Sequence, residues 1–140
     1  MRYLLVAAVT AAVAAAVAAA VAAAVAAAGL AWLRGRYLAV TVEGVSMVPT
    51  LRPGQRLLAR RGAGVTGDIV VVRGGRGLMV KRLAACEGER LPAVLGGGLV
   101  PVGRVAVLGD NPGRSADSRQ FGLLPASAVV AVVRSAPVRT

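Results

Sequence analysis

The hydrophobic pattern begins with one uninterrupted apolar segment at residues 3–33. It contains no charged residue and consists mainly of Ala, Val and Leu. As a helix rising about 1.5 Å per residue, it would reach roughly 46 Å. The hydrocarbon core of a bilayer is thinner, at roughly 30 Å. The pattern therefore predicts a membrane anchor over residues 1–36, in which Arg34 and Arg36 stop further transfer into the bilayer.

Within this segment, valine recurs at every fourth position with alanine between. One interpretation is a small-residue face for helix packing inside the membrane, and the simpler one, which we favour, is a low-complexity hydrophobic anchor. A cleavable signal peptide is a third interpretation, because Ala-x-Ala triplets are frequent. The apolar stretch is far longer than the hydrophobic region of a usual signal peptide, which favours the anchor.

After residue 36 the pattern changes to short apolar runs separated by Gly and Pro, which is typical of β-strands. Strands are predicted at residues 37–42, 55–60, 69–73, 78–83, 93–95, 99–102, 105–108 and 128–134. The Gly-rich turn at 74–77 joins two of them into a hairpin. No soluble helix is predicted. The sequence thus predicts a mostly β domain over residues 37–140, built as a small barrel or a folded sheet.

A glycine pattern in this domain imitates a dinucleotide-binding fingerprint. Gly62, Gly64 and Gly67 match G-x-G-x-x-G after an apolar run. A dinucleotide site requires a helix to begin there, so that the pyrophosphate meets its N-terminus. The run that follows is a predicted strand, so we interpret the glycines as a loop.

The charge balance is strongly basic, with 17 Lys and Arg against 6 Asp and Glu. The basic residues are scattered, and few aromatic residues could stack on bases. Attraction of a tethered domain to anionic lipid headgroups explains the charge without nucleic acid. The lipid bilayer is therefore a predicted partner, and nucleic acid is not.

The chain contains no histidine and only one cysteine, Cys86. This composition excludes Ser-His-Asp and Cys-His catalysis, makes a zinc site very unfavourable, and allows no intramolecular disulfide. No metal or cofactor is predicted.

A nucleophile is nevertheless suggested by Ser46, in the segment Gly-Val-Ser-Met-Val-Pro-Thr-Leu. The candidate base is Lys81, the one lysine among 16 arginines. Strand alternation puts Met79, Lys81 and Leu83 on one face. An amine between apolar side chains has a lowered pKa and can act as a general base, whereas arginine cannot. The alternative is an ordinary surface lysine.

Three segments, at residues 44–51, 67–82 and 109–125, resemble the type I signal peptidases, which are membrane-anchored Ser/Lys peptidases. The resemblance covers about residues 38–134. It implies that Ser46 is the nucleophile and Lys81 the general base. It also implies that Ser115 orients the lysine amine, and that Asp117 and Arg119 form a structural salt bridge.

Other residues of these segments are predicted to have structural roles. We expect Pro49 to fix a turn after the serine, and Met47 to pack in the core. Gly109, Gly113 and Gly122 are expected to supply unusual backbone angles in the last segment.

The chain also departs from the family pattern. Gly44 stands where some relatives have a serine in the oxyanion hole, so the oxyanion is expected to rest on backbone N–H groups around Gly44 and Ser46. Gln55 stands where an acidic residue is usual. Only about 25 residues separate Leu83 from Gly109, where some relatives carry a second β domain. The chain therefore resembles a near-minimal catalytic core.

The resemblance implies a membrane-bound serine endopeptidase that cleaves signal peptides from secreted preproteins. The substrate would carry small residues before the cut and bind as an added strand, along an edge that includes Val40, Val42 and Met79. One alternative is a maturation peptidase for a single precursor, resembling those that process nickel superoxide dismutase precursors. Another is an inactive peptide-binding module.

The resemblance further implies a single-pass protein of the cell membrane with an extracytoplasmic catalytic domain. The positive-inside rule favours the opposite orientation, because Arg34 and Arg36 follow the anchor and only Arg2 and the α-amine precede it.

Overall fold

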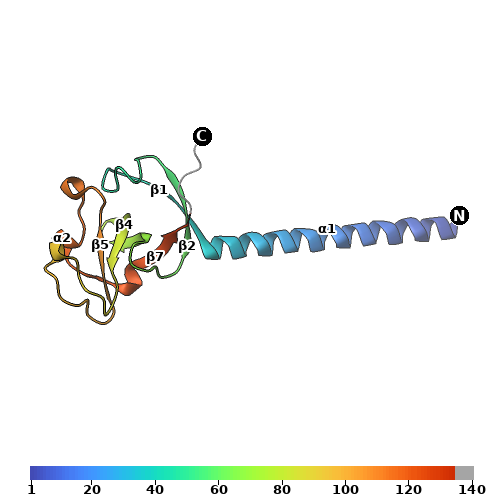
Figure 1. The fold of residues 1–140 in the computed structure, drawn as a ribbon. Coiled ribbons are helices and arrows are strands. Elements are labelled where there is room, and N and C mark those ends of the chain that lie inside the picture. Colours follow the sequence, from blue (N-terminus) through green and yellow to red (C-terminus); the bar gives the residue numbers. More distant parts are fainter. Residues whose placement is uncertain (135–140) are drawn as a thin grey trace. The chain divides into compact units, whose positions relative to one another are not determined.

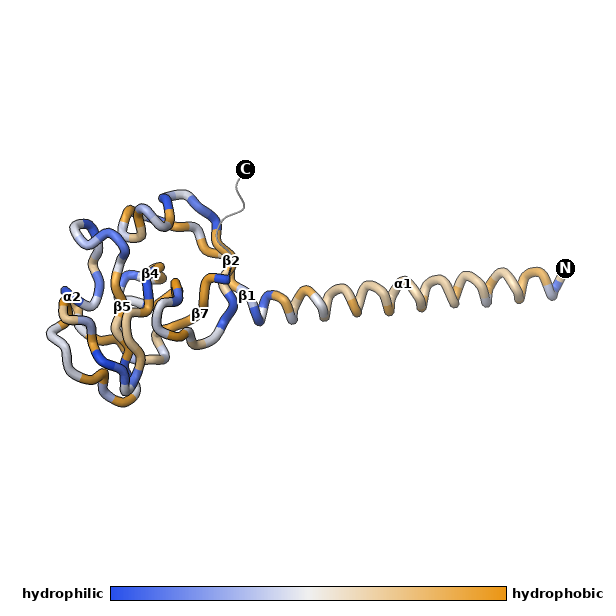
Figure 2. The backbone as a smooth tube through the Cα atoms, viewed as in Figure 1, coloured by the Kyte–Doolittle hydropathy of each residue, from blue (hydrophilic) through white to orange (hydrophobic). Residues whose placement is uncertain are grey.

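The computed structural model describes residues 1–134, and the chain divides into two compact units, Met1–Arg36 and Tyr37–Thr140. The first unit is one helix, α1 (Arg2–Arg36), of 35 residues. Alanine, the best helix former, makes up about half of it. None of its residues is buried, and most residues between its charged ends are coloured as hydrophobic in Figure 2.

Among the described residues, α1 is the one helix that is long and apolar enough to cross a membrane. An apolar surface of this size is unfavourable in water. The helix thus has the length and apolar character that the predicted membrane anchor requires.

The second unit is built on a sheet of seven strands (Figure 1). They are β1 (Tyr37–Thr41), β2 (Arg56–Arg61), β3 (Ile69–Gly74), β4 (Gly77–Ala85), β5 (Arg104–Leu108), β6 (Leu124–Pro125) and β7 (Val129–Val133). The order across the sheet is β1-β2-β7-β3-β4-β5-β6, and every pair is antiparallel. The prediction of a mostly β fold after one helix is confirmed. The sheet stays open between β1 and β6, so the barrel alternative is wrong.

Two predicted strands are absent. Residues 93–95 form a 3-10 helix, η1 (Ala93–Leu95), and of residues 99–102 only Leu99 makes an isolated bridge, to Arg90. Three consecutive glycines at 96–98 have positive φ angles, which a strand cannot accommodate.

The expectation of no soluble helix was also wrong. The short helix α2 (Ser118–Phe121) begins at Asp117, and the 3-10 helices η2 (Pro112–Arg114) and η3 (Ala126–Ala128) flank it. Asp117 and Gln120 form a capping box. This Asp-x-x-Gln pattern is the signal in the sequence that was missed.

The core explains the Val-rich run of β3. Val70, Val71 and Val72 are fully buried, because β3 lies inside the sheet and apolar groups cover both of its faces. Alternate residues contribute to different clusters, with Val70 and Val72 in one and Val71 in another. The centre of the sheet is thus a rigid support for β4.

Two strand segments, β1 and the first half of β4, each have one edge whose backbone groups pair with no other strand among residues 1–134. Residues Gly77–Arg82 of β4 pair with β3, whereas β5 pairs only with the end of β4, from Arg82 onward. β1 pairs only with β2. Unpaired backbone groups therefore remain along β1 and the first half of β4.

Candidate active site

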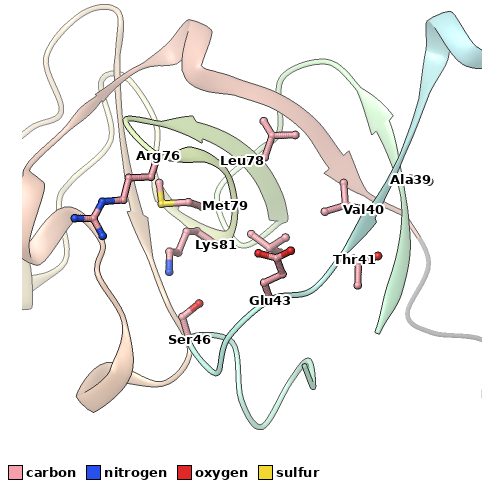
Figure 3. A pocket seen from close by; sticks show the side chains of 10 residues that line it. Ala39, Val40, Thr41, Glu43, Ser46, Arg76, Leu78, Met79 and Lys81 are labelled. Atoms are coloured by element: carbon pink, nitrogen blue, oxygen red, sulfur yellow. The ribbon is translucent and has the colours of Figure 1, made fainter. Parts of the chain in front are cut away.

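A cavity of about 630 Å³ lies between β1, the first half of β4 and the loop that contains Ser46. Its walls are formed by Ala39, Val40, Thr41, Glu43, Ser46, Arg76, Leu78, Met79, Val80 and Lys81. In Figure 3 the Lys81 amine and the Ser46 hydroxyl point toward one another. Within residues 1–134, no three side chains of His, Cys, Asp or Glu come together as metal ligands.

Ser46 lies at the start of a tight turn after β1. Val48 N–H donates to the Val45 carbonyl at 3.1 Å, and Leu51 N–H donates to the Met47 carbonyl at 2.9 Å. Met47 and Leu51 are buried, so core packing fixes the turn from below. Met47 therefore packs in the core as predicted, and half-buried Ser46 is held at the cavity wall.

Lys81 is only 4% exposed, although it carries the most easily hydrated of the basic groups. β4 turns it to the same side as Met79 and Leu83. Burial lowers the pKa of the Lys81 amine from its usual value of 10.5; Asp117 acts against this, and the positive charge of Arg119 adds to it.

Ser115 connects the amine to a carboxylate. Lys81 Nζ donates to Ser115 Oγ at 3.2 Å, and Ser115 Oγ donates to Asp117 Oδ2 at 2.7 Å. The single proton of the Ser115 hydroxyl is used by Asp117, so the hydroxyl can only accept from the amine. When the amine is neutral, one of its N–H groups donates to Ser115. Its lone pair therefore points away from Ser115 and can accept a proton from another group.

Asp117 is fully buried and organises the loop that carries Ser115. Its carboxylate accepts five hydrogen bonds, from Gly109 N–H, the Ser115 hydroxyl, and the N–H, Nε and Nη2 groups of Arg119. Burial alone would raise the pKa of Asp117, but these hydrogen bonds outweigh it and hold the pKa well below its usual range. The Asp117–Arg119 ion pair, at 2.6 Å, has the geometry that the family resemblance implied.

The glycines of this loop differ from expectation. Gly122 has the positive φ that was predicted. Gly109 does not, but a Cβ there would lie 2.7 Å from the Ser46 carbonyl oxygen and would collide with Ser115. A glycine at position 109 therefore lets the loop that contains Ser115 approach the loop that contains Ser46. Gly113 has neither a positive φ nor a close neighbour, so that prediction was wrong.

Residues next to Gly109 tie the two loops together, and the sequence analysis gave them no role. Asn111 N–H donates to the Ser46 carbonyl at 2.9 Å, and Asn111 Nδ2 donates to the Val45 carbonyl at 3.0 Å. Asp110 pairs with Arg82 of β4 at 2.6 Å and accepts from the Thr50 hydroxyl. We call Thr50, Arg82, Asp110 and Asn111 the loop clamp. The signal that could have identified it is the Gly-Asp-Asn sequence itself.

The remaining predicted site residues divide into two groups. Val40 and Met79 line the cavity. Val42 does not, because its side chain is 3% exposed and packs in the core with Met47; its inclusion in the substrate edge was wrong. Gly44 is exposed with φ +71°, and among the hydrogen bonds of residues 1–134, Ser46 N–H donates to no acceptor.

Two family models match the chain. The signal peptidase (peptidase S26) model matches residues 89–136, which include Ser115, and the peptidase S24-like model matches residues 5–91, which include Ser46 and Lys81.

Two curated proteins of Arabidopsis thaliana are similar to this chain. Mitochondrial ATP-independent inner membrane protease subunit 1a is 40% identical over 113 residues, covering 67% of both chains. Subunit 1b is 37% identical over 99 residues, covering 59% of both chains. The chain thus spans roughly two thirds or less of the length of these relatives.

The matches define the class of protein as a peptidase with an apolar helix of membrane-anchor type. Within that class, the chain belongs to the type I signal peptidase-like family.

Proposed function

We propose that the protein is a membrane-bound serine endopeptidase that uses a Ser46–Lys81 dyad to cleave signal peptides from secreted preproteins. The observation that carries this proposal is the buried Lys81 amine, which is hydrogen-bonded to Ser115 and lies with Ser46 in one cavity. Burial lowers the pKa of this amine, which favours the neutral form that a general base requires.

In the first step, Ser46 Oγ attacks the scissile carbonyl while Lys81 Nζ takes the hydroxyl proton. The resulting ammonium then protonates the amine of the leaving peptide, and an acyl-enzyme ester remains on Ser46. In the second step, Lys81 takes a proton from water, whose oxygen attacks the ester, and the proton returns to Ser46. Ser115 holds the amine so that its lone pair faces the reacting oxygen.

Charge develops on the carbonyl oxygen in both steps and needs preorganised donors. Ser46 N–H is available for this, since it has no acceptor among residues 1–134. The adjoining Gly44 leaves the backbone exposed at this point. The oxyanion therefore rests on backbone donors alone, without the hydroxyl that some relatives supply.

The substrate binds in an extended conformation between β1 and the first half of β4, whose unpaired sides border the cavity. Main-chain hydrogen bonds from such edges give affinity without a strong sequence requirement. Val40 and Met79 line the cavity beside Ser46 and limit the size of the substrate side chains there.

A second candidate is a peptidase dedicated to one precursor. The similarity to two inner membrane protease subunits supports it. Under either function, α1 holds the domain at a membrane where the substrate emerges. We place it in the cell membrane with the domain outside the cytoplasm.

The proposal is tested by trapping and mutation in the full chain. Mass spectrometry of the enzyme with an Ala-x-Ala peptide ester should detect an acyl group on Ser46. Ser46→Ala and Lys81→Arg should each lower turnover by at least roughly 10³-fold, and the double variant should be no worse, because the two residues act as a unit. Arginine keeps the charge but cannot release its proton.

Lys81→Met is the matched folding control. It should be equally inactive but no less stable, because methionine fills the same space without the cost of burying an amine. Wild-type turnover in folded Lys81→Arg protein would contradict the proposed mechanism.

A further inference from the structure

Glu43 differs from the other acidic residues of the chain. The sequence contains six Asp and Glu in all. Five of them accept hydrogen bonds, namely Asp68, Glu87, Glu89, Asp110 and Asp117. Within residues 1–134, Glu43 has no hydrogen bond and no ion pair. In a chain with 17 basic residues, an acidic side chain without a partner requires an explanation.

The position of Glu43 supplies one. It lines the same cavity as Ser46 and Lys81. Figure 3 shows its carboxylate between the Ser46–Lys81 pair and the β1 residues Val40 and Thr41. It therefore stands beside the path that we propose for the substrate residues before the cut.

Neither charged neighbour of Glu43 in the cavity forms an ion pair with it among the described residues. Lys81 donates to Ser115, and the groups that act on its pKa are Asp117 and Arg119, together with burial. Arg76 lines the cavity too, but Figure 3 shows its guanidinium directed away from Glu43, and the two form no ion pair. Glu43 is thus not among the groups that shift the pKa of Lys81, and its carboxylate is available to a peptide that binds in the cavity.

We propose that Glu43 is a specificity-determining residue that selects a Lys or Arg side chain in the substrate, at the second or the fourth residue before the cut. This inference rests on the proposed function. Side chains alternate along an extended peptide, so these two positions project to the side opposite that of the small residues at the first and third positions. A cationic side chain there gives Glu43 the partner that the chain itself does not supply.

The size of the effect follows from exposure. Glu43 is exposed, so a charge pair there is worth about 0.2 to 1 kcal/mol at moderate salt. That corresponds to a preference of roughly 1.4-fold to fivefold in kcat/KM. Because salt screens exposed charges, the preference should shrink when the ionic strength is raised.

The experiment uses the full chain in a zwitterionic detergent. Two peptide series keep Ala at the first and third positions before the cut and carry Lys, Gln or Glu at the second or the fourth position. Wild-type enzyme should cleave the Lys peptide of one series faster than its Gln peptide, and its Glu peptide slowest. Glu43→Gln should remove this order, and Glu43→Lys should reverse it.

Val102→Lys is the matched charge control. It raises the net charge by one, as Glu43→Gln does, but at a residue that is 85% exposed and outside the cavity. It should keep the wild-type order. Equal rates for all peptides in wild type, or an unchanged order in Glu43→Gln, would overturn the proposal.

Binding separates this proposal from the proposed function. Fluorescence anisotropy with Ser46→Ala protein measures the affinity for labelled Lys and Glu peptides without cleavage. A Lys preference that Glu43→Gln abolishes would support Glu43 as the selector even if wild-type enzyme formed no acyl-enzyme. Equal affinity for both peptides would reject it, whatever the result for hydrolysis.

Discussion

Lys81 is buried by the strand that carries it and is held by Ser115, so its amine loses hydration without gaining a partner of full negative charge. The nearest carboxylate, Asp117, shares its charge with Arg119 and with the N–H of Gly109. This arrangement explains why the pKa of Lys81 falls despite an acidic group close by. At the scale of single residues, the environment lowers the pKa of the group that we propose as the base.

The lowered pKa predicts a pH dependence. Only the neutral amine can accept a proton, so kcat/KM should rise with pH along a limb whose midpoint lies below the ordinary lysine value of 10.5. Initial rates with one uncharged peptide from pH 6 to 10 measure this. A profile that falls over this range would exclude Lys81 as the base.

We propose Ser115 as a positioning residue, and its replacement separates orientation from stability. Ser115→Ala should lower kcat by about 10² or more with little change in KM, since the amine loses its acceptor. Asp117→Ala should instead lower the free energy of unfolding by about 3–5 kcal/mol, because it leaves Arg119 without a partner. Urea denaturation and steady-state kinetics of both variants distinguish the roles; a fully active Ser115→Ala enzyme would mean that other contacts orient Lys81.

At the scale of elements, the site depends on how closely two loops approach. The loop after β5 is fixed internally by Asp117, and the loop clamp joins it to the turn of Ser46 and to β4. Neither loop has extended regular structure, yet each is held by backbone hydrogen bonds and buried side chains. The distance between Ser46 and Ser115 is therefore set by the clamp and by the absence of a side chain at Gly109.

Gly109→Ala should test this approach directly. The added methyl group would meet the Ser46 carbonyl at 2.7 Å and collide with Ser115, so one loop must shift. Turnover should fall by at least roughly 10²-fold, because a displacement of about 1 Å near reacting groups has an effect of that size. Gly113→Ala is the matched control with open space and should retain activity. Equal activity in both variants would show that the loops tolerate separation.

At the scale of the whole molecule, the apolar helix and the β domain are two units joined without a linker, since β1 begins directly after α1. If α1 anchors the chain in a membrane, as we propose, such a connection keeps the β domain near that membrane in either orientation. Which side it occupies is decided by insertion, where the positive-inside rule and the proposed function disagree.

Reporter fusions to the C-terminus resolve the orientation. A reporter that is active only outside the cytoplasm should be active, and a cytoplasmic reporter should be silent, if the domain meets secreted preproteins where they emerge. The reverse result would contradict the extracytoplasmic location and favour the peptidase dedicated to one precursor.

The sequence alone determined the elements whose signals are local. The apolar run of α1, the valines of β3 and the hairpin to β4 were predicted because hydrophobic pattern and turn residues act within a few positions. Strand alternation likewise indicated that Lys81 would share a face with Met79 and Leu83. The family resemblance, which depends on short motifs, indicated Ser46 and Ser115.

Tertiary structure decided what depends on contacts between distant segments. The sheet stays open because β1 and β6 stand at its two ends and do not pair with one another, and no local pattern contains that order. The side chain of Val42 enters the core, whereas Glu43 enters the cavity, because the chain leaves β1 for the turn of Ser46 at that point. The loop clamp and the space at Gly109 likewise exist only because segments distant in the sequence meet, with clamp partners 28 to 66 positions apart, and no local sequence pattern encodes such contacts.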